Sequence, residues 1–338
     1  MKRVAFFDTK QYDREWFDRI DKSFEIKYFE EKLNSENADL AKGFDGAIAF
    51  VNDKINSKTI KILAEGGVKI LAMRCAGYNN INFKSAHENG LKVVRVPVYS
   101  PYAVAEHTMA LLLTLNRKIH KAYNRTRDFN FALNGLTGFD LNGKTAGVIG
   151  TGKIGQIFIK ICKGFGMNVI AYDPYPIENP DFEYVDLEEI YSRSDVISLH
   201  CPLNQYTHHI LGADAFSKMK SSVYIINTSR GGLIDSEALL NALKSRRIAG
   251  AGLDVYEEEA SVFFEDCSDT IVNDDILARL VSLPNVLLTS HQAFLTEEAL
   301  KNIAEITIEN LEDYFAGKPL KNQICYDCCN GGTTSNCG

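Results

Sequence analysis

The feature that most constrains this chain is a glycine-rich stretch, residues 148–173, with the sequence VIGTGKIGQIFIKICKGFGMNVIAYD. A short apolar run predicts a strand, and it is followed by three glycines in the spacing G-x-G-x-x-G: Gly150, Gly152 and Gly155. The next residues predict a helix, and residues 169–172 predict a second strand that ends at Asp173. This order of strand, glycine turn, helix and strand is typical of a domain that binds a dinucleotide.

Each part of this stretch has a physical role in holding a dinucleotide. Gly150 permits the tight turn, Gly152 lets the backbone approach a pyrophosphate, and Gly155 lets the helix and strand pack closely. The first turn of the helix offers unpaired N–H groups to the phosphates. Asp173 lies 18 residues after Gly155 and can accept hydrogen bonds from both ribose hydroxyls. It would repel a 2′-phosphate, and no Lys or Arg lies between it and Asp181, so we expect NAD and not NADP.

Length, composition and charge limit the class of protein. A chain of 338 residues predicts about two domains, and 45% apolar with 24% charged residues is ordinary for a globular protein. The net charge of −7, without a basic block, argues against nucleic acid as a partner. The first residues lack the apolar segment of a signal peptide, and no run approaches the length of a membrane span. We therefore expect a cytoplasmic protein with no membrane partner.

The cysteines and one histidine pair were considered as metal ligands. Four cysteines are scattered and predict reduced thiols: Cys75, Cys162, Cys201 and Cys267. Four more crowd the last 14 residues, beside Gly, Thr, Ser and Asn: Cys325, Cys328, Cys329 and Cys337. Four thiols can bind zinc, but nothing apolar there is available to pack, so we expect residues 331–338 to be a disordered tail. His208 and His209 have no third ligand nearby in the sequence and predict a surface pair, so we expect no metal.

The chain predicts two doubly wound, parallel-sheet α/β domains. Residues 1–100 alternate short apolar strands with helices, which implies a parallel sheet covered by helices. A single long helix is predicted from Tyr102 to about Asp128, and residues 296–316 predict a helix that returns to the first domain. We therefore expect a Rossmann-type NAD domain, residues 101–295, inserted into a flavodoxin-like substrate domain formed by residues 1–100 and 296–330.

Polar residues follow the predicted strands of the second domain at their carboxyl ends. The residues at or just beyond five such ends are Asp173, His200, Arg230, Asp254 and His291. Ligands of open α/β sheets bind in the crevice beyond these ends. We therefore expect these five side chains to line one cleft.

The chemistry of this predicted cleft suits a 2-hydroxy acid and its 2-oxo partner. When a nicotinamide exchanges a hydride with carbon, a proton must also move on the oxygen, and histidine is the usual acid or base near neutral pH. His291 is the candidate, and Glu257, Glu258 or Glu259 can supply the carboxylate that orients its ring. Arg230 is suited to bidentate binding of a substrate carboxylate.

At these residues the sequence resembles the D-isomer-specific 2-hydroxyacid dehydrogenase family. The resemblance covers about residues 1–320 and is carried by VIGTGKIG, NTSRGGLID, GLDVYEEE and TSHQAF. The segments RCAGYNNI, VRVPVYSP and FFEDCSDTIVNDD are most similar to its fermentative D-lactate dehydrogenase branch. The resemblance implies reduction of pyruvate to D-lactate by NADH. It also implies that Arg230 anchors the substrate carboxylate, His291 donates the proton and Glu259 pairs with His291.

The resemblance also implies a set of binding residues and an oligomer. Beyond the glycines, those implied to contact NAD are Lys153, Ile154, Asp173, Cys201, Pro202, Thr207, Thr228, Ser229, Arg230 and Asp254. Those implied to contact substrate are Ala76, Gly77, Tyr99, Arg230, His291 and Phe294. The family forms dimers or tetramers, and the sequence does not choose between a homodimer and a homotetramer.

Two other functions stay open at this point. The substrate can be a longer 2-oxo acid, because one methylene in an apolar pocket changes specificity by only about 10–200-fold. Outside enzymes, the same fold resembles corepressors that sense NAD. Formate dehydrogenases are a third relative, but they lack an acid at the position of Glu259.

Overall fold

The computed structural model describes residues 1–259, 262–324 and 326. The chain divides into two compact units, which are described one at a time: residues 1–100 with 295–338 form unit 1, and residues 101–294 form unit 2. The predicted tail and the four cysteines from Cys325 to Cys337 lie outside the described residues. None of the helices in the described part of the chain is long and apolar enough to cross a membrane.

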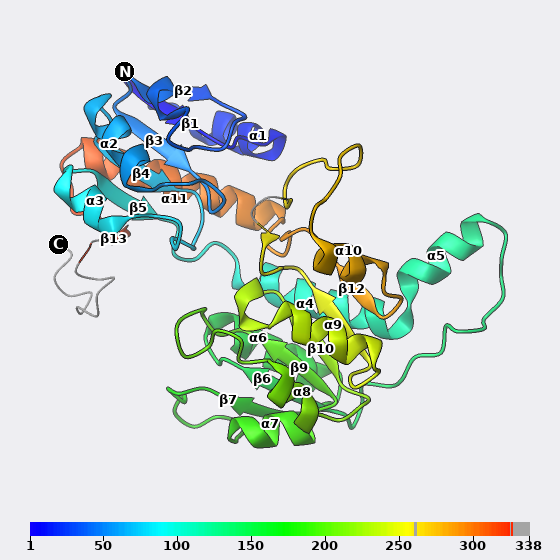
Figure 1. Ribbon diagram of the computed structural model, residues 1–338. Helices are drawn as coiled ribbons and strands as arrows, with labels where there is room; N and C mark the ends of the chain where they lie inside the picture. The colour runs from blue at the N-terminus through cyan, green and yellow to red at the C-terminus, as the bar shows by residue number, and fades with distance from the viewer. Residues whose placement is uncertain (260–261, 325, 327–338) are drawn as a thin grey trace. The chain divides into compact units, whose positions relative to one another are not determined.

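Unit 1 is built on a sheet of six strands in the order β13-β5-β4-β3-β1-β2 (Figure 1). Its strands are β1 (Lys2–Phe6), β2 (Phe24–Tyr28), β3 (Gly46–Ala49), β4 (Ile70–Met73), β5 (Lys92–Arg95) and β13 (Gln323–Ile324). Its helices are α1 (Gln11–Ile20), α2 (Ser57–Glu65), α3 (Phe83–Glu88), α11 (Glu297–Phe315) and the 3₁₀ helix η1 (Ala38–Ala41). The first five strands are parallel in the flavodoxin order 2-1-3-4-5. The edge strand β13 departs from the predicted pattern because it runs antiparallel to β5.

The helix that follows unit 2 in sequence belongs to unit 1. Thr296 caps α11, because its hydroxyl accepts a hydrogen bond from Ala299 N at 3.2 Å. The helix buries Ala304, Ile308 and Leu311 in the same core as the β-strand residues of the first hundred positions. Its apolar stripe thus covers one face of the unit 1 sheet, as expected for a helix with one buried face.

Unit 2 is built on a sheet of seven parallel strands in the order β12-β11-β10-β9-β6-β7-β8. Its strands are β6 (Thr145–Ile149), β7 (Asn168–Tyr172), β8 (Glu183–Tyr184), β9 (Val196–Leu199), β10 (Tyr224–Asn227), β11 (Gly250–Leu253) and β12 (Val286–Leu288). Counted from β6, this is the Rossmann order 3-2-1-4-5-6 with one further strand. The strand order reverses between β6 and β9, which makes their carboxyl ends the place where a ligand crevice is expected.

Helices cover both faces of the unit 2 sheet (Figure 1). They are α4 (Pro101–Arg117), α5 (Ile119–Arg127), α6 (Lys153–Gly164), α7 (Leu187–Arg193), α8 (Ala213–Lys218), α9 (Ser236–Lys244), α10 (Asp275–Ser282) and the 3₁₀ helix η2 (Gly231–Leu233). Residues of α4 and α6 form one core, and residues of α7 to α10 form the other. The predicted class of two parallel-sheet α/β domains is confirmed.

The prediction of one helix from Tyr102 to Asp128 is wrong. Lys118 has φ +51° and ψ +37°, a left-handed conformation that an α-helix cannot contain, so α4 ends at Arg117 and α5 begins at Ile119. Just before the break, Asn116 is buried and bonds the backbone of Phe139 at both N and O, each at 2.8 Å. The returning chain therefore fixes the end of α4. Apolar periodicity along the helix contained no signal of this contact.

Candidate active site

The glycine loop lies at the carboxyl end of β6 and leads into α6. Gly150 has φ +100°, and a Cβ there would lie 2.6 Å from Cys201 N. A Cβ on Gly155 would lie 2.1 Å from Gly150 O, so the helix touches the loop backbone. At Gly152 no atom lies within 4 Å of a Cβ position, and this residue caps α6 without any side-chain hydrogen bond. Space is therefore open at Gly152, and no side chain of the described residues caps the first turn of α6, which is the arrangement that a pyrophosphate requires.

Asp173 lies at the end of β7 and is tied to the glycine loop. Its Oδ2 accepts hydrogen bonds from Thr151 N at 2.7 Å and from Thr151 Oγ1 at 3.1 Å. The Thr151 hydroxyl also lies 2.7 Å from the hydroxyl of Tyr184 on β8. Asp173 is half-buried, and its Oδ1 accepts from Tyr175 N at 2.9 Å. The predicted ribose acceptor thus also holds the loop, a role for Thr151 that the sequence analysis missed although the residue lies inside the motif.

Backbone hydrogen bonds join the carboxyl ends of β10, β11 and β12. Asp254 N donates to Asn227 O at 2.8 Å, and His291 N donates to Asp254 O at 2.7 Å. Arg230 O accepts from Asn227 Nδ2 at 2.9 Å. Arg230, Asp254 and His291 therefore follow three neighbouring strands that end at one edge of the sheet, and Asn227 links them through its side chain to Arg230 and through its backbone to Asp254.

Asp254 is fully buried and organises the segment that carries His291. Its carboxylate accepts hydrogen bonds from Thr289 Oγ1 at 2.5 Å, Gln292 N at 2.9 Å and Ala293 N at 2.8 Å. His107 Nε2 on α4 lies 3.4 Å from Asp254 Oδ1. Burial raises the pKa of Asp254, but the hydrogen bonds from His107 and Thr289 outweigh it and hold the pKa below its usual range. Asp254 therefore fixes the backbone around His291 through hydrogen bonds that favour its charged form.

His291 and Glu259 form the clearest side-chain pair at this edge. His291 Nδ1 lies 2.7 Å from Glu259 Oε1, and both side chains are mostly buried, with 18% and 16% of their surface exposed. Glu259 is held in turn by Tyr256 N, which donates to Oε2 at 3.1 Å. His291 has φ +52°, a region that few residues other than glycine adopt, and the ring of Phe264 lies 5.9 Å away. Among the described residues, no hydrogen bond involves His291 Nε2, so that ring nitrogen is the one available to a ligand.

Arg230 is half-buried beside the end of β10. Its Nη1 donates to Ser229 O at 2.7 Å, and within the described part of the chain its guanidinium forms no salt bridge. Ser229 Oγ donates to Cys201 O at 2.8 Å, which joins the segments that follow β9 and β10. A guanidinium without a carboxylate partner can bind an anionic ligand in a bidentate way.

The other predicted NAD contacts lie on the same unit in different settings. Lys153 is exposed at the first residue of α6, and Ile154 is half-buried beside it. The hydroxyl of Thr228 is bonded to Thr108 on α4 at 2.8 Å, so it faces the helix. Thr207 Oγ1 donates to Pro202 O at 2.6 Å and closes the loop after β9. Cys201 is buried, and burial raises the pKa of its thiol to about 11, so it contributes no thiolate.

The predicted substrate-binding residues fall on both units. Ala76 and Gly77 follow β4 in unit 1, where Arg95 Nη1 donates to Ala76 O at 2.8 Å. Tyr99 O, also in unit 1, accepts from Asn302 Nδ2 of α11 at 2.6 Å. Phe294 is buried at the end of unit 2. These contacts fix the backbone of two predicted segments, and the role of the four residues in substrate binding stays a prediction.

The interpretation of His208 and His209 as a pair without a third ligand is wrong. Glu257 lies against them, with its Oε1 2.6 Å from His209 Nε2, and candidate ligand atoms of the three residues all lie within 4.8 Å of one another. Burial raises the pKa of Glu257, but hydrogen bonds from His209 and Ser236 outweigh it and lower the pKa. The sequence separates the residues by about 48 positions, so only the fold brings them together.

His200 is the remaining polar residue predicted at a strand end. Its backbone N donates to Ile149 O at 2.7 Å, its Nε2 lies 2.9 Å from Ser198 Oγ, and its ring packs 5.1 Å from that of Phe158. Burial lowers the pKa of His200 to about 3. This histidine is therefore neutral and packed against the glycine loop, and it is not suited to donate protons to a ligand.

Comparison with known proteins agrees with this geometry. Residues 109–293 match the family described as D-isomer specific 2-hydroxyacid dehydrogenase, NAD binding domain. A 2-hydroxyacid dehydrogenase homolog of Haemophilus influenzae is 51% identical over 327 residues, covering 95% of this chain and 99% of the relative. The D-lactate dehydrogenase of Escherichia coli is 50% identical over 327 residues, with the same coverage of both chains. The solved structure of the pyruvate reductase of Chlamydomonas reinhardtii has a TM-score of 0.90 at 43% identity and covers 95% of this chain and 98% of its own.

The chain belongs to the D-isomer specific 2-hydroxyacid dehydrogenase family, and unit 2 contains its NAD-binding domain. The predicted family, the predicted cofactor NAD and the prediction of an NAD-dependent dehydrogenase are thereby confirmed.

Proposed function

We propose that the protein is a D-lactate dehydrogenase that reduces pyruvate to D-lactate, with His291 as the proton donor. The observation that carries this proposal is the His291–Glu259 pair, 2.7 Å apart, at the edge of an NAD-binding sheet that also presents Arg230. The similarity to the D-lactate dehydrogenase of Escherichia coli and the pyruvate reductase of Chlamydomonas reinhardtii supports pyruvate as the substrate.

The cofactor would be held by residues whose geometry fits it. Gly150, Gly152 and the first turn of α6 would take the pyrophosphate, and Asp173 would take the adenosine ribose. When bound, NADH supplies the hydride that reduces the 2-oxo carbon. We also propose that Lys153, Ile154, Cys201, Pro202, Thr207, Thr228, Ser229 and Asp254 line this cofactor site.

The protein's own groups would bind the substrate and move the proton. Arg230 would pair with the carboxylate of pyruvate and polarise its 2-oxo oxygen. Glu259 accepts from His291 Nδ1, which leaves Nε2 to carry the proton that passes to the same oxygen. The overall reaction is pyruvate plus NADH plus a proton giving D-lactate plus NAD⁺, so one proton is consumed for each hydride transferred.

We further propose Ala76, Gly77, Tyr99 and Phe294 as substrate contacts, a homodimer or homotetramer as the assembly, and the cytoplasm as the location.

The test is NADH oxidation with pyruvate, followed by chiral analysis of the lactate formed. His291→Asn should lower kcat by about 10²–10⁴-fold while NADH still binds, because the general acid is lost and the glycine loop is intact. Glu259→Gln keeps a hydrogen-bond acceptor for Nδ1 but removes the charge, and should give a smaller loss. Undiminished turnover by His291→Asn, or L-lactate as the product, would contradict the proposal.

The length of the preferred 2-oxo acid needs a separate measurement. Comparison of kcat/KM for pyruvate, 2-oxobutyrate, oxoisocaproate and phenylpyruvate gives the preference directly. A higher value for oxoisocaproate than for pyruvate would keep the reaction and the roles of Arg230 and His291, and would change only the substrate. No NADH oxidation with any of them would favour a cofactor-sensing protein over an enzyme.

A further inference from the structure

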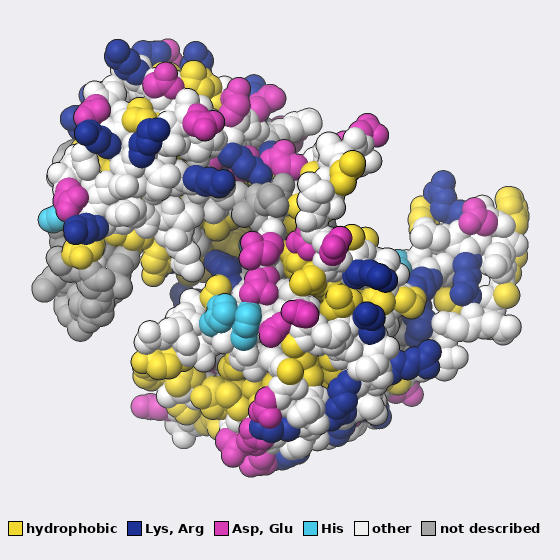
Figure 2. Space-filling model, in the orientation of Figure 1, with side chains coloured by type: hydrophobic (Ala, Val, Ile, Leu, Met, Phe, Trp, Pro, Cys, Tyr) yellow, Lys and Arg dark blue, Asp and Glu magenta, His cyan; other side chains and the backbone are white. Residues whose placement is uncertain are grey.

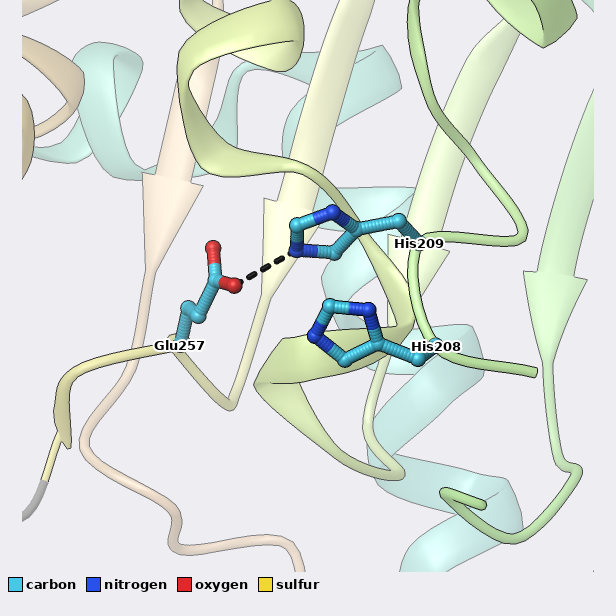
Figure 3. Close-up of side chains that lie close together, drawn as sticks. All are labelled: His208, His209 and Glu257. Carbon is cyan, nitrogen blue, oxygen red and sulfur yellow. Dashed lines mark hydrogen bonds and ion pairs between the residues drawn. The ribbon is translucent and has the colours of Figure 1, made fainter. Parts of the chain in front are cut away.

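A histidine–histidine–glutamate cluster lies on unit 2 outside the proposed hydride-transfer site. His208 and His209 lie on the loop between β9 and α8, and Glu257 lies on the segment that follows β11. Figure 3 shows both imidazole rings and the carboxylate of Glu257 turned toward one another. The two rings are stacked with centroids 3.8 Å apart, and candidate ligand atoms of the three residues lie within 4.8 Å of one another.

Neighbouring groups orient two of the three side chains. His209 Nδ1 lies 4.0 Å from Asp235 Oδ2, so a carboxylate faces the ring nitrogen opposite the one that contacts Glu257. Glu257 Oε2 accepts a hydrogen bond from Ser236 N at 3.4 Å, which leaves Oε1 directed at the histidines. A metal-bound histidine usually donates its second ring N–H to a carboxylate, a carbonyl or water, and metal-bound carboxylates are in turn hydrogen-bonded. Asp235 lies close enough to take the first role after a small movement, and Ser236 N takes the second.

The backbone below the cluster is closely packed. His209 N donates to Gly232 O at 2.9 Å. A Cβ on Gly231 would lie 2.0 Å from Tyr256 C and 2.4 Å from Glu257 N, so the segment of Glu257 rests directly on this glycine. His208 is exposed, while His209 and Glu257 are half-buried, so the cluster is open to solvent on one side. Figure 2 shows histidine side chains at the surface of unit 2 beside acidic ones.

We propose that His208, His209 and Glu257 form a binding site for a divalent transition-metal cation of the zinc type. Two imidazole nitrogens and one carboxylate oxygen are the donor set of a three-ligand zinc site, which leaves one position for water. At metal–ligand distances of about 2.0–2.1 Å, tetrahedral ligand atoms lie roughly 3.3 Å apart. The cluster reaches this geometry when the contact of 2.6 Å between His209 and Glu257 opens slightly and His208 turns inward.

The site links two loops that the proposed chemistry uses. Glu257 lies two residues before Glu259, and His209 lies two residues after Thr207. A bound cation would therefore connect the segment that carries the partner of His291 to the loop after β9. Within the described residues, no hydrogen bond or ion pair joins the cluster to Arg230, Glu259 or His291, so the cation would act as a clamp between loops and would not take part in the reaction.

The test is calorimetric titration of the full chain with ZnCl₂ in a buffer that does not bind zinc. The four cysteines at the carboxyl end also offer thiols, so the background is C325S/C328S/C329S/C337S. We expect one zinc per chain in this background, an affinity lowered at least about 10-fold in His208→Ala and in Glu257→Gln, and a higher unfolding temperature when zinc is present. His87→Ala removes an exposed histidine of unit 1 and should bind as the background does.

Two outcomes would overturn the proposal: no zinc binding in the background, or binding that His208→Ala and Glu257→Gln leave unchanged. Circular dichroism of each variant shows that the chain is folded. Glu257→Asp provides a second variant that keeps the carboxylate on a shorter side chain, and it should bind more weakly than the background but more tightly than Glu257→Gln. Because zinc binding is measured without substrate, a failure of the proposed lactate chemistry would not affect this result.

Discussion

Both units place an arginine directly after a buried strand or within three residues of it, yet the two arginines are used differently. Arg74 follows β4 in unit 1 and is 1% exposed. Its Nη1 lies 3.2 Å from Asp13 Oδ1, its Nη2 donates to Asp8 O at 2.6 Å, and its Cζ lies 3.9 Å from the centroid of the Phe50 ring. Arg230 follows β10 in unit 2, is half-buried, and has no acidic partner among the described residues.

The difference shows what separates a structural charge from one that can bind a ligand. In unit 1 the carboxylate of Asp13 on α1 pairs with Arg74 and the backbone carbonyl of Asp8 accepts a second hydrogen bond, so the guanidinium is satisfied before any ligand arrives. In unit 2 the residues on either side of Arg230 are Ser229 and Gly231, and neither can pair with a guanidinium charge. Local sequence after a strand is therefore a poor guide to function unless it also shows whether a partner is available within the fold.

Removing the buried arginine should have the largest effect on stability. Arg74→Leu leaves the Asp13 carboxylate buried and unpaired, so the free energy of unfolding should fall by about 3–5 kcal/mol. Urea unfolding measures the loss, and hydrogen exchange should locate it in unit 1. The double variant Asp13→Leu/Arg74→Leu removes both charges and should recover part of the stability. A loss below about 1 kcal/mol in the single variant would show that the pair is not structural.

Removing the second arginine should affect activity and leave stability nearly unchanged. Arg230→Gln should lower kcat/KM for pyruvate by about 10²–10³-fold, because it removes the charge that we propose binds the carboxylate and polarises the 2-oxo oxygen. The free energy of unfolding should change by no more than about 0.5 kcal/mol. Arg230→Lys is the matched control: it keeps the charge but not the bidentate geometry, and should be intermediate. If Arg230→Gln unfolded as readily as Arg74→Leu, the contrast between the two units would be lost.

Asp53, a buried acid of unit 1 near Arg74 and Asp8, should make the free energy of unfolding depend on pH. Burial raises the pKa of Asp53 to about 7, although Phe50 N and Leu33 N each donate to its carboxyl at 2.6 Å. An unfolded aspartate has a pKa near 3.9, so the folded state holds an extra proton between about pH 4 and pH 7. Asp53 therefore makes its full contribution to the free energy of unfolding below about pH 4. This contribution, roughly 2–4 kcal/mol, is lost as the pH rises to about 7.

Unfolding of Asp53→Asn across this range measures that slope. The amide does not titrate, so the variant should lack this part of the pH dependence, even if it is less stable at low pH because one backbone N–H loses its acceptor. Parallel stability curves for the variant and the parent chain would contradict the assignment. Arg74 and Asp8, which also act on Asp53, are present in both proteins.

Within unit 2, substitution of two glycines of the same loop should give smaller effects, one on the free energy of unfolding and the other on NADH binding. Gly155→Ala puts a Cβ 2.1 Å from Gly150 O, so it should lower the free energy of unfolding by about 1–3 kcal/mol. Gly152→Ala meets no atom within 4 Å and has φ −65°, so stability should hold, while the new methyl group should cost about 1–3 kcal/mol of NADH binding. Fluorescence titration with NADH measures the second effect. Equal losses of stability in both variants would contradict these assignments.

The sequence predicted unit 2 well because its strands are short apolar runs that stop at polar residues. Asp254 directly follows β11, whose four residues are all buried, and His291 lies three residues beyond the edge strand β12, whose last two residues are half-buried. The pairing of His291 with Glu259 required the family resemblance, because three glutamates in a row offered the same chemistry. The two-residue strands β8 and β13 were not predicted, since their pairing depends on partners far away in the sequence.

Other features could not be predicted because they arise only from tertiary contacts. The break at Lys118 depends on the chain near Phe139 reaching the end of α4. Glu257 meets His208 and His209 only because the sheet brings two loop segments together. The contacts of His107 Nε2 with Asp254 Oδ1 and Thr289 Oγ1 depend on how α4 packs on the sheet.

Asp173 connects coenzyme choice to the shape of the phosphate-binding turn. The carboxylate of Asp173 would repel the 2′-phosphate of NADP, so a change of coenzyme would require its replacement by a residue without negative charge. Here the same carboxylate receives two hydrogen bonds from Thr151, so its removal would release the middle of the turn as well as the proposed contact with the ribose. An engineer who wants to exchange the coenzyme should therefore expect to supply a new partner for Thr151 together with a positive charge for the added phosphate.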